Sequence, residues 1–505
     1  MKLLKIKTIL FFAFCSLFFA LLQWSPSFAD PDSFYHAKMA ALMGQEGVIN
    51  TFPWLKFASF SQNFTDQHFF YHLLLIPFIS VFPSFLGVKI LTVLLAMSVI
   101  VFFYFFLQRW GIRWPIFYIL VLLSIPPFVF RINLAKAGPL AIIILFIGLS
   151  LIWQKRYRAL FLLSFLYVWT HGGWILLLIL TVCQIISEII TNKEHLFCKG
   201  NRRLLLAVFG GIITGLIINP SFPHNLQFYW EQLVQIGAVN YQNILEVGGE
   251  WHPLKISDSV SINTSFLILT FAVWTAFFWR IKDETGETDE RFNKLLTLYI
   301  FSVLLAVMTI KSQRYIEYFV PFFVLTNAFL LNFFLLRDFS PSQSLKIFFQ
   351  SSLSHKTIVI FITSGWLILF LCSGWKLRQQ LTGRISWSYL QNASQWLKEK
   401  TPFRSLVFHS DWSDFPMLFF HNDRNTYIAG LDPTFFYLFD SKLYQKWDKI
   451  IGGEEPDMAE IIKKDFGANF VLIKPTEIKL LEKVEKNSAF SLKYRDKEAQ
   501  IFQIR

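Results

Sequence analysis

The sequence predicts an α-helical polytopic membrane protein that ends in a C-terminal α/β domain. Of its 505 residues, 54% are hydrophobic and only 16% are charged, which is typical of a chain that crosses a bilayer many times. Long apolar runs recur up to residue 375, whereas charged residues are spread through residues 376–505. This contrast excludes a single soluble domain with one large core and divides the chain into two parts.

The apolar runs predict about eleven transmembrane helices, because ~20 apolar residues cross the hydrocarbon core of a bilayer. We interpret residues 69–86 as an interfacial helix, since a span there would place the basic residues of 109–113 and 155–158 outside. The predicted spans lie at residues 8–24, 88–107, 115–130, 138–153, 159–170, 174–190, 204–219, 264–280, 295–310, 317–335 and 357–375.

The distribution of lysine and arginine predicts the orientation of the chain. The loops on the side of the N-terminus hold most of the basic residues between the spans, so that side is cytoplasmic. An odd number of spans then makes the C-terminal domain extracytoplasmic, in a plasma or inner membrane. The net charge of +13 belongs largely to these loops, so nucleic acid is not expected as a partner.

The first apolar run has two interpretations. Lys2, Lys5 and Lys7 precede it and Ser27-Phe28-Ala29 follows it, which is the pattern of a cleavable signal peptide. The run also leads into a chain with many spans, which favours a retained first helix over residues 1–24. The other expected regions are a first external loop (25–87), a helical bundle (88–375) with a second long external loop (220–263), and the α/β domain (376–505).

The C-terminal part alternates between strand and helix patterns. Strands are predicted at residues 405–409, 426–431 and 469–474, and helices at residues 386–398 and 456–466. This alternation is typical of a small α/β domain. The region contains no cysteine, which excludes a disulfide framework or a thiolate metal site within it.

The first external loop begins with a polar cluster directly after the first span. Asp30, Asp32, Tyr35 and His36 fall within seven residues. Ionisable groups beside lipid are costly and often functional, so one interpretation is that a carboxylate here binds a cation or accepts a proton. The other interpretation is structural, with an aspartate that caps a helix over residues 33–43.

The end of the same loop carries a second polar cluster. Asp66, His68 and His72 lie within about two helical turns of one another, so they could share one face of the interfacial helix. Asp66 and His68, together with Asp32, are candidate ligands for a divalent cation such as Mg²⁺ or Mn²⁺. In the alternative interpretation, Asp66 is a helix N-cap and His72 makes a polar contact.

Three further external turns carry polar or charged side chains. His171 lies in a Gly-Gly turn between two tryptophans, where it could face a cleft. Glu246 and Glu250 flank Gly248-Gly249, which fits a mobile substrate-binding loop or an ordinary exposed turn. Arg314 precedes a late apolar run, so it could grip a phosphate with its forked guanidinium or extend to the membrane surface.

Taken in order, these loops resemble those of the GT-C superfamily of membrane glycosyltransferases, and in particular the catalytic subunits of oligosaccharyltransferases. That family has an acidic Asp-x-x-Tyr/Phe motif in its first external loop, and the segment from Asp32 to His36 falls on it. The segment from Arg131 to Gly138 takes the place of the family's second external motif. The acidic pair of that motif is absent here, and Lys136 lies close by.

The later loops continue the resemblance. Glu246 or Glu250 corresponds to a family glutamate that contacts acceptor and metal, and Arg314 to an arginine near the donor phosphate. Residues 411–416 are a degenerate match to the Trp-Trp-Asp-Tyr-Gly motif of the family's external domain. The resemblance covers most of the chain in the order of its loops, and only the first motif matches closely in residues.

The resemblance implies a glycosyltransferase that moves a sugar or glycan from a polyprenyl-phosphate-linked donor to a glycan, lipid or protein acceptor. Transfer would occur at the extracytoplasmic face by one inverting displacement. Asp32 would be the base or a metal ligand, supported by Asp30. The residues expected to bind donor or acceptor are Arg314, Lys136, Arg131, Glu246 or Glu250, His36 and His171.

Two other functions stay open at this point. A transporter of lipid-linked glycans would need polar residues along a path at mid-bilayer, and the predicted spans contain few of them. A non-catalytic GT-C-like protein that binds a lipid-linked glycan would be consistent with the absent acidic pair.

Overall fold

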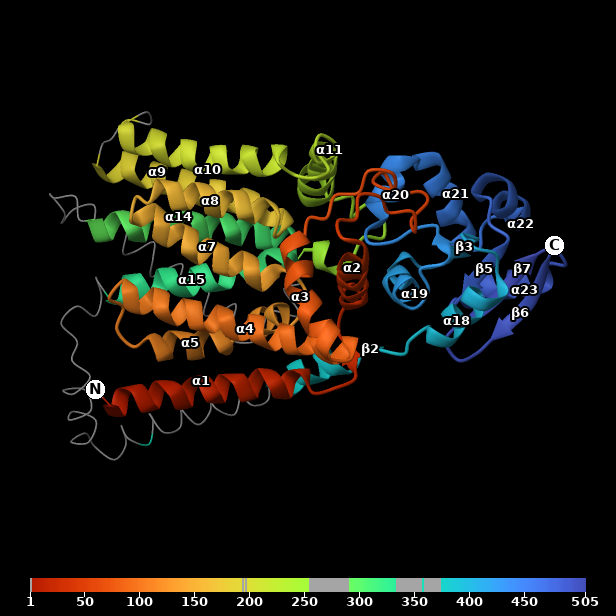
Figure 1. The fold of residues 1–505 in the computed structure, drawn as a ribbon, viewed down its shortest axis with the longest axis horizontal. Helices are drawn as coiled ribbons and strands as arrows, with labels where there is room; N and C mark the ends of the chain where they lie inside the picture. Colours follow the sequence, from red (N-terminus) through yellow and green to blue (C-terminus); the bar gives the residue numbers. More distant parts are fainter. Residues whose placement is uncertain (1, 193–194, 196–197, 254–289, 333–356, 358–373) are drawn as a thin grey trace.

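The structure is a computed structural model that describes residues 2–192, 195, 198–253, 290–332, 357 and 374–505. Long helices lie side by side as a bundle at one end of the molecule, and a domain with a β-sheet lies at the other end (Figure 1). The chain starts at the far end of the bundle and ends in the sheet domain, so the two termini lie at opposite ends.

The described part of the bundle is built from helices of very different length. Five are long and apolar enough to cross a membrane: Ile6–Gln23, Ser84–Arg109, Gly172–Thr191, Lys199–Ile217 and Glu290–Lys311. The bundle helices are α1 (Lys2–Gln23), α4 (Ser84–Arg109), α5 (Pro115–Leu123), α6 (Pro126–Ile132), α7 (Gly138–Trp153), α8 (Tyr157–Val168), α9 (Ile175–Asn192), α10 (Lys199–Ile217), α14 (Glu290–Lys311) and α15 (Ile316–Leu330).

The described residues thus confirm the expected bundle of apolar helices. They do not establish the expected number of eleven spans. The expected span at 115–130 is broken into α5 and α6, which meet at 89° where Pro126 and Pro127 follow Ile125 and a continuous helix is disfavoured. The expected spans at 138–153 and 159–170 are apolar helices of only 16 and 12 residues. Residues 264–280 and most of 357–375 lie outside the described residues.

The first external loop forms two helices that lie across the end of the bundle. Helix α2 (Asp32–Glu46) covers the expected helix over 33–43, and α3 (Phe69–Val81) is a 13-residue helix, shorter than a span. Figure 1 shows α2 between the bundle and the sheet domain. The second external loop forms α11 (His224–Trp230), the π-helix η2 (Glu231–Val239) and the short 3₁₀-helix η3 (Gly249–Trp251).

The C-terminal domain contains a mixed five-stranded sheet in the order β4-β3-β5-β7-β6. Strands β3, β4 and β5 are parallel and coincide with the three predicted strands, whereas β7 pairs antiparallel with both β5 and β6. Its elements are α18 (Gln391–Lys400), β3 (Leu406–His409), α19 (Phe415–His421), β4 (Thr426–Tyr427), α20 (Pro433–Phe439), α21 (Ser441–Ile451), α22 (Met458–Ile461), η7 (Ile462–Phe466), β5 (Phe470–Ile473), α23 (Ile478–Lys486), β6 (Phe490–Arg495) and β7 (Gln500–Ile504).

Several contacts join this domain to the first external loop. The two-residue strands β1 (Ser27–Phe28) and β2 (Ile385–Ser386) pair antiparallel, and Leu55 forms a parallel bridge with Tyr427. Lys38 on α2 donates to Asp423 at 2.7 Å. The ring of Phe34 on α2 stacks on Trp387 with centroids 4.7 Å apart. These contacts hold the first external loop against the C-terminal domain.

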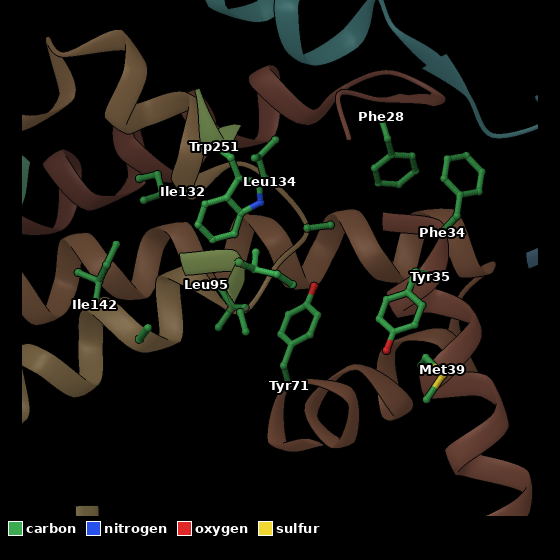
Figure 2. Packing of buried hydrophobic residues seen from close by; sticks show 14 of the residues in the cluster. Phe28, Phe34, Tyr35, Met39, Tyr71, Leu95, Ile132, Leu134, Ile142 and Trp251 are labelled. Atoms are coloured by element: carbon green, nitrogen blue, oxygen red, sulfur yellow. The ribbon is translucent and has the colours of Figure 1, made fainter. Parts of the chain in front are cut away.

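Buried aromatic and aliphatic side chains hold the end of the bundle to α2 and α3. Figure 2 shows Phe28 beside Phe34, and Tyr35 near Tyr71 on the facing helix. Trp251 packs among bundle residues in the same view and is only 6% exposed. This packing holds the loops that carry the polar residues in place at the end of the bundle.

Small residues allow close helix contacts in the bundle, and Gly211 on α10 provides a test. A Cβ at this position would clash with the backbone carbonyl of Phe161 on α8. We expect Gly211→Ala to destabilise the protein by about 1–3 kcal/mol, seen as a lower melting temperature in detergent. Gly200→Ala on the same helix is the control, because its nearest neighbour is the Cys198 sulfur at 3.9 Å. Equal melting temperatures for the two variants would contradict this packing.

Candidate active site

A cavity of about 110 Å³ lies where the bundle, the external loops and the C-terminal domain meet. Polar and charged groups line one part of it and aromatic rings the other. The lining residues are Asp32, Tyr35, His36, Phe60, Phe64, Thr65, Gln67, His68, Arg131, Lys136, Gly138, His171, Phe228, Gln232, Ile236, Glu250, Trp251, Arg314, Glu317, Leu431, Asp432 and Phe435.

The start of α2 brings the first motif to this cavity. Asp30 Oδ1 accepts the backbone N–H of Asp32 at 2.8 Å, so the first aspartate fixes the entry to the helix. Asp32 itself lies in the first turn, where the helix dipole favours a negative charge. His36 follows one turn later, and both side chains line the cavity. The N-cap of α2 is Pro31 and has no side-chain cap hydrogen bond, so the expected helix-capping aspartate is not found.

Lys136 is the centre of a group of carboxylates. Its Nζ lies 2.9 Å from Asp30 Oδ2, 2.8 Å from Asp32 Oδ2 and 3.5 Å from Glu250 Oε2. An ammonium has three donors, so one lysine can engage all three carboxylates. The second external motif thus contacts the first motif directly through the lysine.

Two arginines extend this group. Arg131 donates from Nη1 to Glu250 at 2.6 Å and from Nε to Glu317 at 2.9 Å. Arg314 donates from Nη1 to the other oxygen of Glu250 at 2.7 Å, and its guanidinium lies 4.7 Å from the centre of the Trp251 ring. Glu250 is therefore held by both arginines and Lys136, while the ring supports the Arg314 fork.

Burial and neighbouring charges shift the pKa values of Asp32 and Glu250 in opposite directions. Burial raises the pKa of Asp32 to about 6, although Lys136 opposes the shift. Burial also acts on Glu250, but Arg314, Lys136 and Arg131 outweigh it and hold its pKa well below the usual value. Glu250 is therefore a permanent anion at neutral pH, whereas Asp32 can exchange a proton close to neutrality.

Histidines form the neutral side of the cavity. His36 Nδ1 lies 2.8 Å from His72 Nε2, and the ring centres of His36 and His68 are 5.0 Å apart. His171 Nδ1 accepts the backbone N–H of Gly173 at 2.8 Å. Burial, followed by Arg314 and Arg131, lowers the pKa of His171 to about 3. Burial also holds the pKa of His36 and His68 well below the usual value.

The candidate metal ligands do not come together. Asp32 pairs with Lys136, whereas Asp66 accepts from His72 at 2.6 Å and from the backbone N–H of His68 at 2.9 Å. In the described part of the chain, no three His, Cys, Asp or Glu side chains are grouped so that they could hold a metal ion. Asp32, Asp66 and His68 therefore do not form such a group. Asp66 is also not the N-cap of α3, which is His68.

Most of the other predicted site residues converge. The structure places Asp30, Asp32, Arg131, Lys136, Glu250 and Arg314 in one charged group, with His36 and His171 on the wall of the same cavity. Glu246 is exposed and is not a lining residue; its backbone carbonyl accepts from Trp412 at 3.0 Å. Glu250 is thus the member of this pair that reaches the site.

Glu317 is a site residue that sequence reasoning did not select. Its carboxylate lies against Gly138, 3.3–3.4 Å from where a Cβ would stand. Gly138 is close to the position where the family's acidic pair is absent, so a carboxylate from α15 approaches that place from another part of the chain. The signal in the sequence was an acidic residue at the start of an apolar run, and the structure shows that this glutamate is buried in the first turn of α15.

No family model and no curated protein matches the sequence. The structure resembles the oligosaccharyltransferase AglB from Archaeoglobus fulgidus, described in complex with an inhibitory peptide and a dolichol-phosphate. The TM-score is 0.63 at 11% identity, over 93% of this chain and 69% of that chain.

Two further solved structures share the architecture. ArnT from Cupriavidus metallidurans, bound to undecaprenyl phosphate, has a TM-score of 0.58 at 12% identity, over 98% of this chain and 97% of that one. The mycobacterial arabinofuranosyltransferase AftD has a TM-score of 0.54 at 12% identity, over 97% of this chain and 41% of that one. All three are GT-C superfamily members, so the chain has the fold of integral membrane proteins of this type.

The ionisation of Asp32 can be tested directly. Lys136→Met removes the nearest cation, so the pKa of Asp32 should rise from about 6 by about 1–3 pH units, as measured by the carboxyl band in infrared difference spectra. Asp30, Glu250 and Arg131 still face the site in this variant. The control is Lys38→Met, which removes a cation from α2, the helix that carries Asp32. Lys38 pairs with Asp423, so its loss should leave the titration of Asp32 unchanged. A titration unaltered in Lys136→Met would contradict the ion pair.

Proposed function

We propose that this protein is a membrane glycosyltransferase that moves a sugar or glycan from a polyprenyl-phosphate-linked donor to an acceptor. The observation that carries the proposal is the convergence of Asp32, Lys136, Arg131 and Arg314 on one cavity. A leaving phosphate requires fixed positive charge, and an attacking hydroxyl requires a nearby base. The GT-C fold adds support, because two of the similar structures are described with polyprenyl-type phosphates.

The place of the cavity suits a lipid-linked substrate. Its lining residues come from the loops and helix ends of the membrane part and, with Leu431, Asp432 and Phe435, from the C-terminal domain. A donor could leave its lipid tail along the bundle while its phosphate and sugar reach the cavity. The distribution of basic residues in the sequence supports the extracytoplasmic side for this end of the bundle.

We assign donor binding to the cationic side chains. Among the described residues, Arg314 uses one of its N–H groups on a carboxylate, so the rest of its five-donor fork is open to phosphate oxygens. Arg131 and Lys136 extend the positive wall. These fixed charges oppose the negative charge that grows as the bond between sugar C1 and the phosphate oxygen breaks.

We assign the base to Asp32, supported by Asp30. The acceptor oxygen attacks C1 from the face opposite the phosphate, and its proton passes to the Asp32 carboxylate, which gives inversion in one displacement. A pKa of about 6 keeps Asp32 mostly ionised at neutral pH while it remains basic enough to accept the proton. Glu250, His36 and His171 would contact the acceptor.

Lys136 takes the role that a divalent cation would have between acidic loops. It bridges Asp30 and Asp32 at 2.9 and 2.8 Å, so its single positive charge offsets part of the negative charge of the two carboxylates. The proposed reaction therefore has no step that depends on Mg²⁺ or Mn²⁺.

The decisive test is sugar release from extracted polyprenyl-linked donors by purified protein. We expect Asp32→Asn to reduce turnover by about a hundredfold or more without changing donor affinity, and EDTA to leave wild-type turnover unchanged. Asp423→Asn is the matched control, because Asp423 also pairs with a lysine but lies outside the cavity.

The alternatives make different predictions in the same assay. Wild-type turnover by Asp32→Asn would remove the assigned base. Donor binding without release by any folded variant would favour a lipid-linked glycan-binding protein, and movement of intact donor across vesicles would favour a transporter. Loss of wild-type activity in EDTA would restore a cation to the mechanism.

A further inference from the structure

A second set of side chains lines the cavity besides the charged group around Lys136. It includes two glutamines, Gln67 and Gln232. They approach each other at Gly172, since a Cβ on this glycine would clash with Gln67 Oε1 and lie 3.6 Å from Gln232 Cγ. Neither side-chain amide makes a hydrogen bond with another residue that the structure describes. Both amides are therefore free to donate to a ligand and to accept from it.

Thr65 adds a buried hydroxyl to the same set. Its side chain lines the cavity and is 1% exposed, and its Oγ1 has no hydrogen-bond partner among the described residues. A buried hydroxyl without a partner is destabilising, and most such groups in proteins bond to protein, ligand or ordered water. Because Thr65 faces the cavity, a ligand there can supply the missing partner.

The C-terminal domain adds a buried carboxylate. Asp432 lines the cavity, and its Oδ1 accepts the backbone N–H of Thr434 at 2.9 Å. Its Oδ2 forms no hydrogen bond or ion pair with any residue in the described ranges, so it can accept hydrogen bonds from a ligand. Burial raises the pKa of Asp432 to about 6, so the group is mostly ionised at neutral pH.

Aromatic rings connect these polar groups. Phe435 follows Asp432 in the first turn of α20, and its ring stacks on Phe228 with centres 5.9 Å apart and planes at 11°. Phe228 and Gln232 are one turn apart where α11 continues into η2, so they share a face. The side chains form one surface, the amide wall, which consists of Thr65, Gln67, Phe228, Gln232, Asp432 and Phe435.

This combination of groups suits a sugar ring rather than a lipid chain. A sugar ring presents C–H groups on its faces, which pack on aromatic rings, and hydroxyls around its edge, which pair with amide, hydroxyl and carboxylate groups. An isoprenoid chain in the same place would leave Thr65, Gln67 and Gln232 without partners, which is unfavourable. A sugar acid would place a second anion beside Asp432, and like charges in contact oppose binding.

We propose that the amide wall is the subsite for the sugar of the donor and that it selects an uncharged sugar over a sugar acid. This inference rests on the proposed function and deepens it by naming the class of sugar. The charges of Glu250 and Arg314 both act on Asp432, so the amide wall adjoins the group assigned to the phosphate. One donor can thus place its phosphate on the arginines and its sugar against the amide wall.

The binding of synthetic donors tests the selection for an uncharged sugar. The probes are short polyprenyl phosphates that carry glucose or glucuronic acid, titrated by calorimetry into the purified protein in nanodiscs at neutral pH. We expect the wild type to bind the glucose donor about tenfold more tightly than the glucuronic acid donor, and Asp432→Asn to reduce this difference to about threefold or less. Equal affinity of the wild type for the two donors would overturn the selection.

Asp440→Asn is the matched control for this variant. Asp440 caps α21 in the same way as Asp432 caps α20, and it lies outside the cavity. Asparagine is as good an N-cap as aspartate, so each variant keeps its cap and only Asp432→Asn changes the charge of the amide wall. Asp440→Asn should therefore retain the wild-type preference, and the same loss of preference in both variants would contradict the role of Asp432.

Gln67→Leu tests whether the amide wall contacts the sugar. The reference probe is the methyl ester of the same polyprenyl phosphate, which keeps the charge of the donor but lacks the sugar. We expect Gln67→Leu to weaken binding of the glucose donor about fivefold to tenfold and to leave binding of the methyl ester unchanged. Gln62→Leu is the control, because Gln62 lies in the same loop but is exposed and outside the cavity. Equal effects of Gln67→Leu on the two probes would overturn the subsite.

The same probes separate the subsite from the proposed function. A wild-type protein that prefers the glucose donor in binding but releases no sugar from any donor would refute the transfer and retain the subsite. A wild-type protein that releases sugar but binds the glucose donor no more tightly than the methyl ester would retain the transfer and overturn the subsite.

Discussion

The arrangement of the site depends on the contact of Lys136 with the carboxylates of Asp30, Asp32 and Glu250. These groups come from three separate loops, and each would be unstable beside lipid without a partner of opposite charge. Arg131 and Arg314 add two positive charges through their contacts with Glu250 and Glu317. The loops therefore hold one another in place through the same atoms that face the cavity.

This arrangement has a consequence for ligand binding. Glu250 occupies donors of Lys136, Arg131 and Arg314, so a phosphate that enters must compete with a carboxylate for the same cations. The competition keeps the cationic groups in position before the ligand arrives, which reduces the cost of ordering them on binding. It also limits affinity, which would suit the release of phosphate in the proposed reaction.

The sequence allowed the order of the loops and the identity of the first motif to be predicted, because both are local features. It could not show which partners meet across the chain. Arg131 and Glu317 are 186 residues apart, and His36 and His72 are 36 apart, so no spacing rule links them. Glu246 and Glu250 were indistinguishable for the same reason. Strands β6 and β7, which form the antiparallel edge of the sheet, were not predicted.

The C-terminal domain forms part of the cavity wall through a turn at the start of α20. Leu431 adopts a positive φ of 64°, and Asp432 Oδ1 accepts the backbone N–H of Thr434 at 2.9 Å at the start of α20. This turn presents Asp432 and Phe435 to the cavity. Because Lys38 on α2 pairs with Asp423 of the same domain, the helix that carries Asp32 and His36 is fixed to the cavity's opposite wall. Lys38 and Asp423 are not among the lining residues, so this ion pair joins the two parts of the chain outside the cavity.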